Sequence, residues 1–170
     1  ELLLAFISSD GPSNSASSFT SVTGGNLTWK LRKRVNAQAG TSEIWQAVAP
    51  NVLSNATVRA TRSGSWVSSL VVASFTGAEL AVDGVTGGAS GSNGAPTASL
   101  TTTRTGSWVW GVGNDWDGAT TRTVGANQTK VDEYLGSVGD TFWVQRQNNL
   151  SGAAGSTVTI NDTAPTNHRW

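Results

Sequence analysis

The chain has 170 residues, which suits a single domain over residues 1–170 and allows a sizeable core without disulfides. It contains no cysteine, and its 11 basic and 11 acidic residues cancel, so we expect no thiolate metal site, no nucleic-acid partner and no anionic membrane surface. No stretch reaches the roughly 18 consecutive apolar residues that a membrane helix needs, so membrane insertion is not expected.

The apolar residues occur in short runs with a period of two, separated by Gly, Asn, Ser and Pro, and almost none follow a helical period. This pattern predicts an all-β fold. The expected strands, in chain order, cover residues 2–7, 19–23, 27–35, 43–49, 56–62, 66–75, 97–104, 107–113, 128–135, 141–147 and 156–161. About eleven strands favour a two-sheet antiparallel sandwich of the jelly-roll type. The glycine-rich residues 77–96 are expected to form the longest loop.

Two features set the expected arrangement of the strands. Residues 2–7 are apolar at every position, which predicts a central strand covered on both faces. Residues 61–67 and 103–109 share the pattern Thr-Arg-Ser/Thr-Gly-Ser-Trp-Val. We interpret these two copies as equivalent hairpin turns, each followed by a strand that begins with tryptophan, at one end of the two sheets.

The strand expected over residues 107–113 has two unlike faces. Trp108, Trp110 and Val112 point to one side and are expected in the core. Gly111 and Gly113 point to the other side and leave room for another backbone or a ligand to approach. The strand leads into a loop of acidic and amide residues, the densest group of functional side chains in the chain.

Catalytic patterns are sparse. The single histidine, His168, lies near the C-terminus, and the chain has neither a Gly-x-Ser-x-Gly motif nor a cysteine nucleophile. Asp115 and Asp117 are close enough in sequence to resemble the two carboxyl groups of a glycosidase, which lie about 5–10 Å apart. Paired Asp in a Gly- and Asn-rich loop is more typical of turn chemistry or of a cation site. We therefore expect no enzymatic activity.

Acidic and amide residues stand at the ends of the first, middle and last strands. If these strands are neighbours, their ends converge and could supply the six to eight oxygen ligands that calcium prefers. The candidate calcium ligands are Asp10, Asn114, Asp115, Asp117 and Asp162. The simpler interpretation, which we favour, is that each Asp caps its own turn by accepting hydrogen bonds from nearby backbone N–H groups.

Aromatic and amide side chains also suggest a sugar-binding surface. Along residues 141–147 an apolar face alternates with a face that carries Trp143, Gln145 and Gln147. A tryptophan ring can stack on a pyranose while amides bond its hydroxyls, and Trp116 lies in the acidic loop with the same potential. The alternative is that a loop or the other sheet covers Trp143, because tryptophan is usually mostly buried. The candidate sugar-binding residues are thus Trp116, Trp143, Gln145 and Gln147.

The composition is that of secreted β-rich modules: Ser, Thr and Gly are abundant, eight tryptophans are present, and cysteine and methionine are absent. A secreted or cell-surface location is therefore expected. Five Asn-x-Ser/Thr sequons offer sites for glycosylation if the source organism modifies them. They begin at Asn26, Asn55, Asn127, Asn149 and Asn161.

The motifs at residues 43–47, 111–117, 139–145 and 161–165 carry a family resemblance. They read Glu-Ile-Trp-Gln-Ala, Gly-Val-Gly-Asn-Asp-Trp-Asp, Gly-Asp-Thr-Phe-Trp-Val-Gln and Asn-Asp-Thr-Ala-Pro. With them the chain resembles, over nearly its whole length, a β-sandwich module that recurs in secreted multidomain bacterial proteins and has no assigned activity. In such modules a further apolar strand usually follows the equivalents of Arg169 and Trp170. The resemblance therefore implies a C-terminal strand that is missing here or supplied by another molecule.

These observations lead to two hypotheses. The first is a non-enzymatic extracellular structural or adhesive module, a self-assembling surface or filament subunit whose partners are neighbouring copies of itself or adjacent domains. A donated strand would satisfy unpaired sheet edges in such an assembly. The second is a carbohydrate-binding module that recognises polysaccharide through exposed tryptophans. Neither needs a cofactor, apart from calcium if the acidic residues form a site.

Overall fold

The computed structural model describes residues 1–13 and 15–170, and this part of the chain contains strands but no helix. Accordingly, no helix of the described residues is long and apolar enough to cross a membrane. All strand pairs are antiparallel, which confirms the predicted all-β antiparallel class. The strands are β1 (Leu2–Ser9), β2 (Phe19–Gly24), β3 (Lys30–Val35), β4 (Thr41–Val48), β5 (Val58–Arg62), β6 (Ser68–Phe75), β7 (Thr97–Thr101), β8 (Trp110–Asp115), β9 (Thr123–Val124), β10 (Gln128–Leu135), β11 (Thr141–Gln147) and β12 (Thr157–Ala164).

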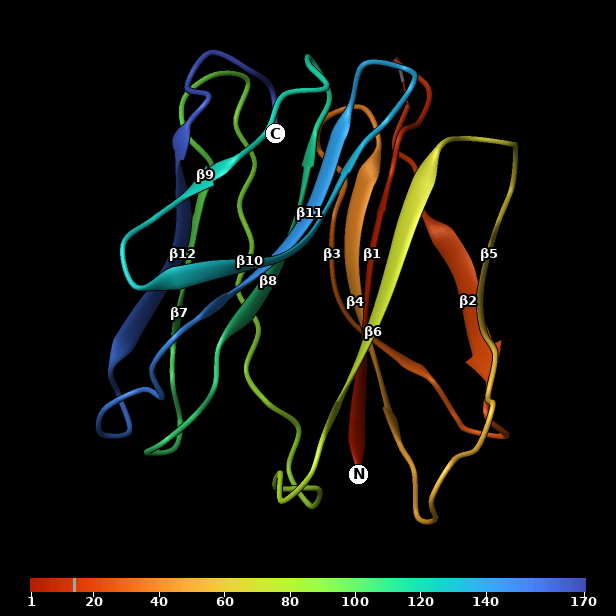
Figure 1. The fold of residues 1–170 in the computed structure, drawn as a ribbon, viewed down its shortest axis with the longest axis vertical. Coiled ribbons are helices and arrows are strands. Elements are labelled where there is room, and N and C mark those ends of the chain that lie inside the picture. Colours follow the sequence, from red (N-terminus) through yellow and green to blue (C-terminus); the bar gives the residue numbers. More distant parts are fainter. Residues whose placement is uncertain (14) are drawn as a thin grey trace.

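The strands form four hydrogen-bonded sheets, ordered β3-β4-β1-β6, β10-β11-β8, β7-β12-β9 and β2-β5. We call the four-stranded sheet the central sheet. Figure 1 shows β2 and β5 on one side of it, and β8, β10 and β11 on the other, with β7, β9 and β12 beyond them. The sandwich is thus built from more than two sheets. The jelly-roll order of strands stays a prediction.

Strand β1 lies between β4 and β6 and is covered on both faces, as its apolar sequence predicts. On one face Leu3, Ala5 and Ile7 join a buried cluster with Trp29 and Trp45, against the sheet of β2 and β5. On the other face the ring of Phe6 stacks on Trp110 of β8, with 5.6 Å between ring centroids. Because alternate residues of β1 enter two different cores, a single strand positions the two halves of the molecule.

The repeated Thr-Arg-Ser/Thr-Gly-Ser-Trp-Val segments are not hairpins. Strand β5 pairs with β2 while β6 pairs with β1, and β7 pairs with β12 while β8 pairs with β11. Each segment therefore carries the chain from one sheet to another. The prediction that both segments turn within a sheet, at one end of the molecule, is wrong. Figure 1 shows the turn before β6 at the top and the turn before β8 at the bottom, because similar local turns do not determine which strand each arm pairs with.

Trp110 and Trp108 differ in their surroundings. Trp110 packs on Phe6 and meets the ring of Phe75 edge-on at 5.2 Å. Trp108 precedes β8 and remains 44% exposed, with the guanidinium of Arg146 at 5.0 Å from its ring. The expectation of a core position is therefore wrong for Trp108, because the strand starts later than predicted.

The remaining boundaries follow the sequence closely. Residues 77–96 contain no strand, as predicted, and the turn at residues 136–140 joins β10 to β11, which pair as a hairpin. The short strand β9 was not expected, because two residues are too few to show a period.

Candidate functional site

The ends of β1, β8 and β12 converge, as predicted, but an arginine lies where a metal ion was considered. Asp115, the last residue of β8, and Asp162 of β12 both form ion pairs with Arg122, and all three side chains are fully buried. Arg122 Nε donates to Asp162 Oδ2 at 2.8 Å, and Nη1 donates to Asp115 Oδ2. The guanidinium also lies 4.7 Å from the ring of Trp143. A side-chain cation thus neutralises the converging carboxylates.

The other candidate calcium ligands face different partners. Asp10 Oδ1 accepts hydrogen bonds from its neighbour Gly11 N at 2.6 Å and from Trp116 Nε1 at 3.0 Å. Asn114 Nδ2 donates to Ser9 O at 2.9 Å. Asp117 forms an ion pair with Arg169 at the surface. Within the described residues no group of three acidic, histidine or cysteine side chains could hold a metal ion, and calcium binding stays a prediction.

Turn capping, the interpretation that the sequence favoured, is confirmed for two residues. Asp10 accepts from Gly11 N, and Asp115 Oδ1 accepts from Asp117 N at 2.9 Å. The Asp115 carboxylate therefore caps a turn with one oxygen and forms ion pairs with the other. The Asp115–Asp117 pair is not arranged for glycoside cleavage, since Asp115 is buried in its ion pairs and Asp117 points to the surface.

His168 is anchored rather than loose. Its Nδ1 lies 2.7 Å from Asp115 Oδ2, and the neighbouring Arg169 O accepts a hydrogen bond from Trp116 N at 3.1 Å. Trp170 exchanges two backbone hydrogen bonds with Gly91, each 2.9 Å long. No sequence pattern indicates this contact, because it joins the C-terminal segment to a loop that is distant along the chain. In the described part of the chain no hydroxyl side chain is hydrogen-bonded to His168, so its pairing with Asp115 does not extend to a nucleophile.

The four candidate sugar-binding residues are all engaged within the molecule. Trp143 is only 4% exposed, and its Nε1 donates to Gln145 Oε1 at 2.8 Å. Gln145 Nε2 donates to Asn161 O at 3.2 Å, and Gln147 Nε2 donates to Thr159 O at 2.6 Å. The amides thus bond the backbone of β12 in place of sugar hydroxyls. Of the two alternatives for Trp143, an open platform or a covered ring, the structure shows the covered ring, because β12 and Arg122 lie over that face.

Trp116 is likewise covered. The guanidinium of Arg169 lies 4.0 Å from its ring centroid, and its indole N–H is bonded to Asp10. Asp117 accepts from Arg169 Nε at 2.8 Å, and this hydrogen bond holds the pKa of Asp117 below its usual value. Trp116 therefore fastens the C-terminal segment to the loop after β8.

The two glycines of β8 are explained by side chains that lie on them. A Cβ at Gly113 would lie 2.1 Å from Trp143 Cζ2, and a Cβ at Gly111 would lie 2.8 Å from Ile160 Cγ2. The expected close approach is therefore real. It is made by an indole ring and a β12 side chain.

Asp140 is a further buried acid, and sequence reasoning missed it. It is 2% exposed, and its Oδ2 has no hydrogen-bond partner among the described residues. Burial, together with the negative charges of Asp10 and Asp115, raises its pKa to about 7. Burial also raises the pKa of Asp162 to about 6, although Arg122 opposes this shift. The Gly-Asp turn at residues 139–140 is the only local signal for Asp140, and such turns are usually exposed.

Of the five sequons, four begin at exposed asparagines. Asn26, Asn55 and Asn127 also have positive φ, between 52° and 59°, which Asn tolerates in turns. Asn161 differs, because its Oδ1 accepts from Gln128 Nε2 at 2.8 Å. Glycosylation stays a prediction for all five asparagines, and at Asn161 the Nδ2 atom that would carry the sugar donates to Asp162 O at 3.3 Å.

Comparisons of the chain with protein-family models, with curated proteins and with solved structures yield no match. The resemblance to a secreted bacterial module therefore stays a prediction. The buried polar groups, which first suggested a metal or sugar site, hold the strand ends and the C-terminal segment together.

Proposed function

We propose that the protein is a non-enzymatic extracellular structural module that associates with copies of itself through the outer edge of β6. The observation that carries this proposal is the composition of β6, which has eight residues, Ser-Ser-Leu-Val-Val-Ala-Ser-Phe, at the end of the central sheet. It pairs only with β1 among the described strands, and its sequence has no charge and no proline. A long apolar edge of this kind is a template for pairing with another chain.

Two other edges of the molecule are protected. Strand β3, at the opposite end of the central sheet, carries four basic residues and a bulge between Leu31 and Lys33. Strand β10, the other eight-residue edge strand, carries Lys130, Asp132 and Glu133 and also has a bulge. Charges and bulges are the features that prevent edge pairing, and β6 has neither.

The surroundings of β6 favour the same interpretation. Leu70 and Val72 are each 37% exposed on the face toward β5, and Trp66 beside them is 40% exposed. A groove of about 430 Å³ lies there between β5 and β6. Pairing of two β6 strands across a twofold axis would join two four-stranded sheets into one and would cover part of this apolar surface.

Sedimentation velocity over a wide concentration range tests the proposal. The wild-type protein is expected to associate with increasing concentration, and Val72→Lys to sediment as a monomer because a charge then lies on the pairing edge. The matched control is Val131→Lys, which adds the same charge on β10 at a valine that is 41% exposed, and it should associate like wild type. A wild-type protein that stays monomeric at every concentration would contradict the proposal.

A further inference from the structure

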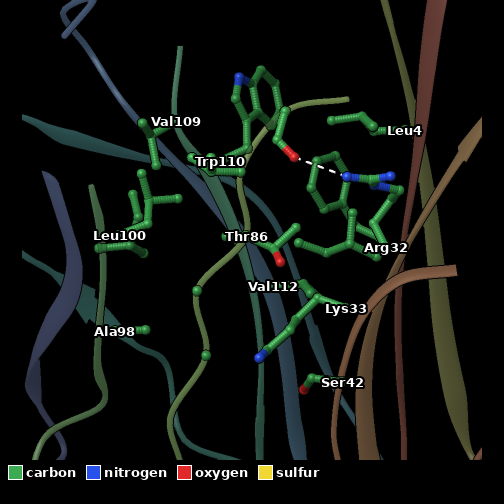
Figure 2. A pocket seen from close by; sticks show the side chains of 18 of the residues that line it. Leu4, Arg32, Lys33, Ser42, Thr86, Ala98, Leu100, Val109, Trp110 and Val112 are labelled. Carbon is green, nitrogen blue, oxygen red and sulfur yellow. Dashed lines mark hydrogen bonds between the residues drawn. The ribbon is translucent and has the colours of Figure 1, made fainter. Parts of the chain in front are cut away.

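A large apolar space lies beside β8. Its volume is about 690 Å³, within the range of protein ligand sites. One wall is the face of the central sheet that carries Leu4, Phe6 and Ile44, and the opposite wall carries Leu100 and Ile160. Figure 2 shows Leu4 and Leu100 on opposite sides of this space, with Trp110 and Val112 between them.

The space lies at the edge of a sheet rather than over one of its faces. Trp110 and Val112 belong to one face of β8, and Gly111 and Gly113 belong to the other, yet all four line the same space. Strand β8 ends the sheet β10-β11-β8 and pairs only with β11 among the described strands. The space therefore runs along the edge of β8 between two apolar walls, and residues 82–90 of the same chain also line it.

One cation on the wall lacks a partner. Arg32 forms an ion pair with Asp83 and donates to Gly84 O at 2.9 Å. Lys33, its neighbour on β3, is half-buried and makes no hydrogen bond or ion pair with the described residues. Figure 2 shows its side chain extending from β3 into the space. An occupant with a carboxylate near Lys33 would neutralise this charge.

We propose that this space accepts an extended peptide strand of another polypeptide, with apolar side chains on both faces and a carboxylate that meets Lys33. The backbone edge of β8 would supply main-chain hydrogen bonds, and the two walls would take alternate side chains, which point in opposite directions from a strand. Gly113 O already accepts a hydrogen bond from Ser8 Oγ at 2.9 Å, and a compact apolar ligand would leave the rest of that edge without hydrogen-bond partners. The site is separate from β6, so it does not depend on the proposed self-association.

The probe is a synthetic peptide with the sequence of residues 1–9, a glutamate followed by a strand that is apolar on both faces. The protein is the full chain with Val72→Lys, in which pairing through β6 is blocked. Peptide binding at β8 is then measured independently of self-association, so that either proposal can fail without the other. Titration calorimetry measures binding, and hydrogen exchange measures protection of the β8 amides. Saturable binding that protects β8 is expected. The same peptide with proline in place of its central alanine should not bind, because it cannot pair along the edge.

Two substitutions locate the binding. Lys33→Gln is expected to weaken peptide binding about tenfold, equivalent to about 1.4 kcal/mol, while Lys30→Gln on the same strand but outside the space leaves it unchanged. Ala98→Trp, which fills the space, should abolish it, with thermal melting checking that each variant folds. The proposal is overturned if the peptide does not bind, if the proline peptide binds equally well, or if dodecanoate binds in the space and the peptide does not.

Discussion

Replacing Arg122 with methionine should be one of the most damaging single changes in the molecule. The side chains of Arg122, Asp115 and Asp162 are all fully buried, and the arginine donates to both carboxylates. Like arginine, methionine has an unbranched side chain, but it carries no charge. Asp115 and Asp162 would therefore be left without their counter-ion. Removing one partner of a buried ion pair costs about 3–5 kcal/mol, because the remaining charge is desolvated and uncompensated.

The comparison variant removes all three charges together. In Arg122→Met with Asp115→Asn and Asp162→Asn, no uncompensated charge remains, and most of the lost stability should return. Arg169→Met is the surface control: its ion pair with Asp117 is partly exposed, so the change should cost about 1 kcal/mol or less. Urea unfolding followed by tryptophan fluorescence gives each free energy of unfolding. If Arg122→Met costs no more than Arg169→Met, the interpretation of Arg122 as the cation of this site is wrong.

Three further predictions concern the same region. Burial raises the pKa of Asp140 to about 7, so the folded wild-type protein loses stability as the pH rises from about 4 to 7. Asp140→Asn should therefore be more stable than wild type at pH 8, by up to about 4 kcal/mol. A stability advantage of the variant that is equally large at pH 4 would contradict this. Gly113→Ala should cost at least about 2 kcal/mol, because its Cβ meets the Trp143 ring, whereas Gly84→Ala, with open space around its Cβ, should be nearly neutral in thermal melting. Addition of a calcium chelator should leave the melting temperature unchanged, because Arg122 already neutralises the converging carboxylates, and a drop on chelation would support the calcium hypothesis.

The class of the fold could be predicted from the sequence because each strand carries its own period-two pattern. Strand β1 is the exception, since it is apolar at every position from residue 2 to residue 7, and this indicated a central strand covered on both faces. The pairing of strands could not be predicted. The two similar turns after β5 and β7 look like hairpins locally, but long-range packing sends their arms into different sheets.

The candidate site was predicted in part. The convergence of Asp115 and Asp162 followed from placing acidic residues at the ends of neighbouring strands. Arg122 could not be identified, because it lies in an irregular loop where no period marks a buried side chain. The sequence left the exposure of Trp143 open for a related reason: the ring is covered by Arg122 and β12, which are distant in sequence, so the polar amides beside it resembled an exposed binding face.

The central claim, that β6 is the surface through which copies of the chain associate, is tested most directly by hydrogen exchange at the backbone amides of β6. We predict that exchange within residues 68–75 slows as the protein is concentrated, because the outer edge then gains hydrogen-bond partners, and that Val72→Lys removes this effect. Exchange rates in β6 that do not change with protein concentration would contradict the claim.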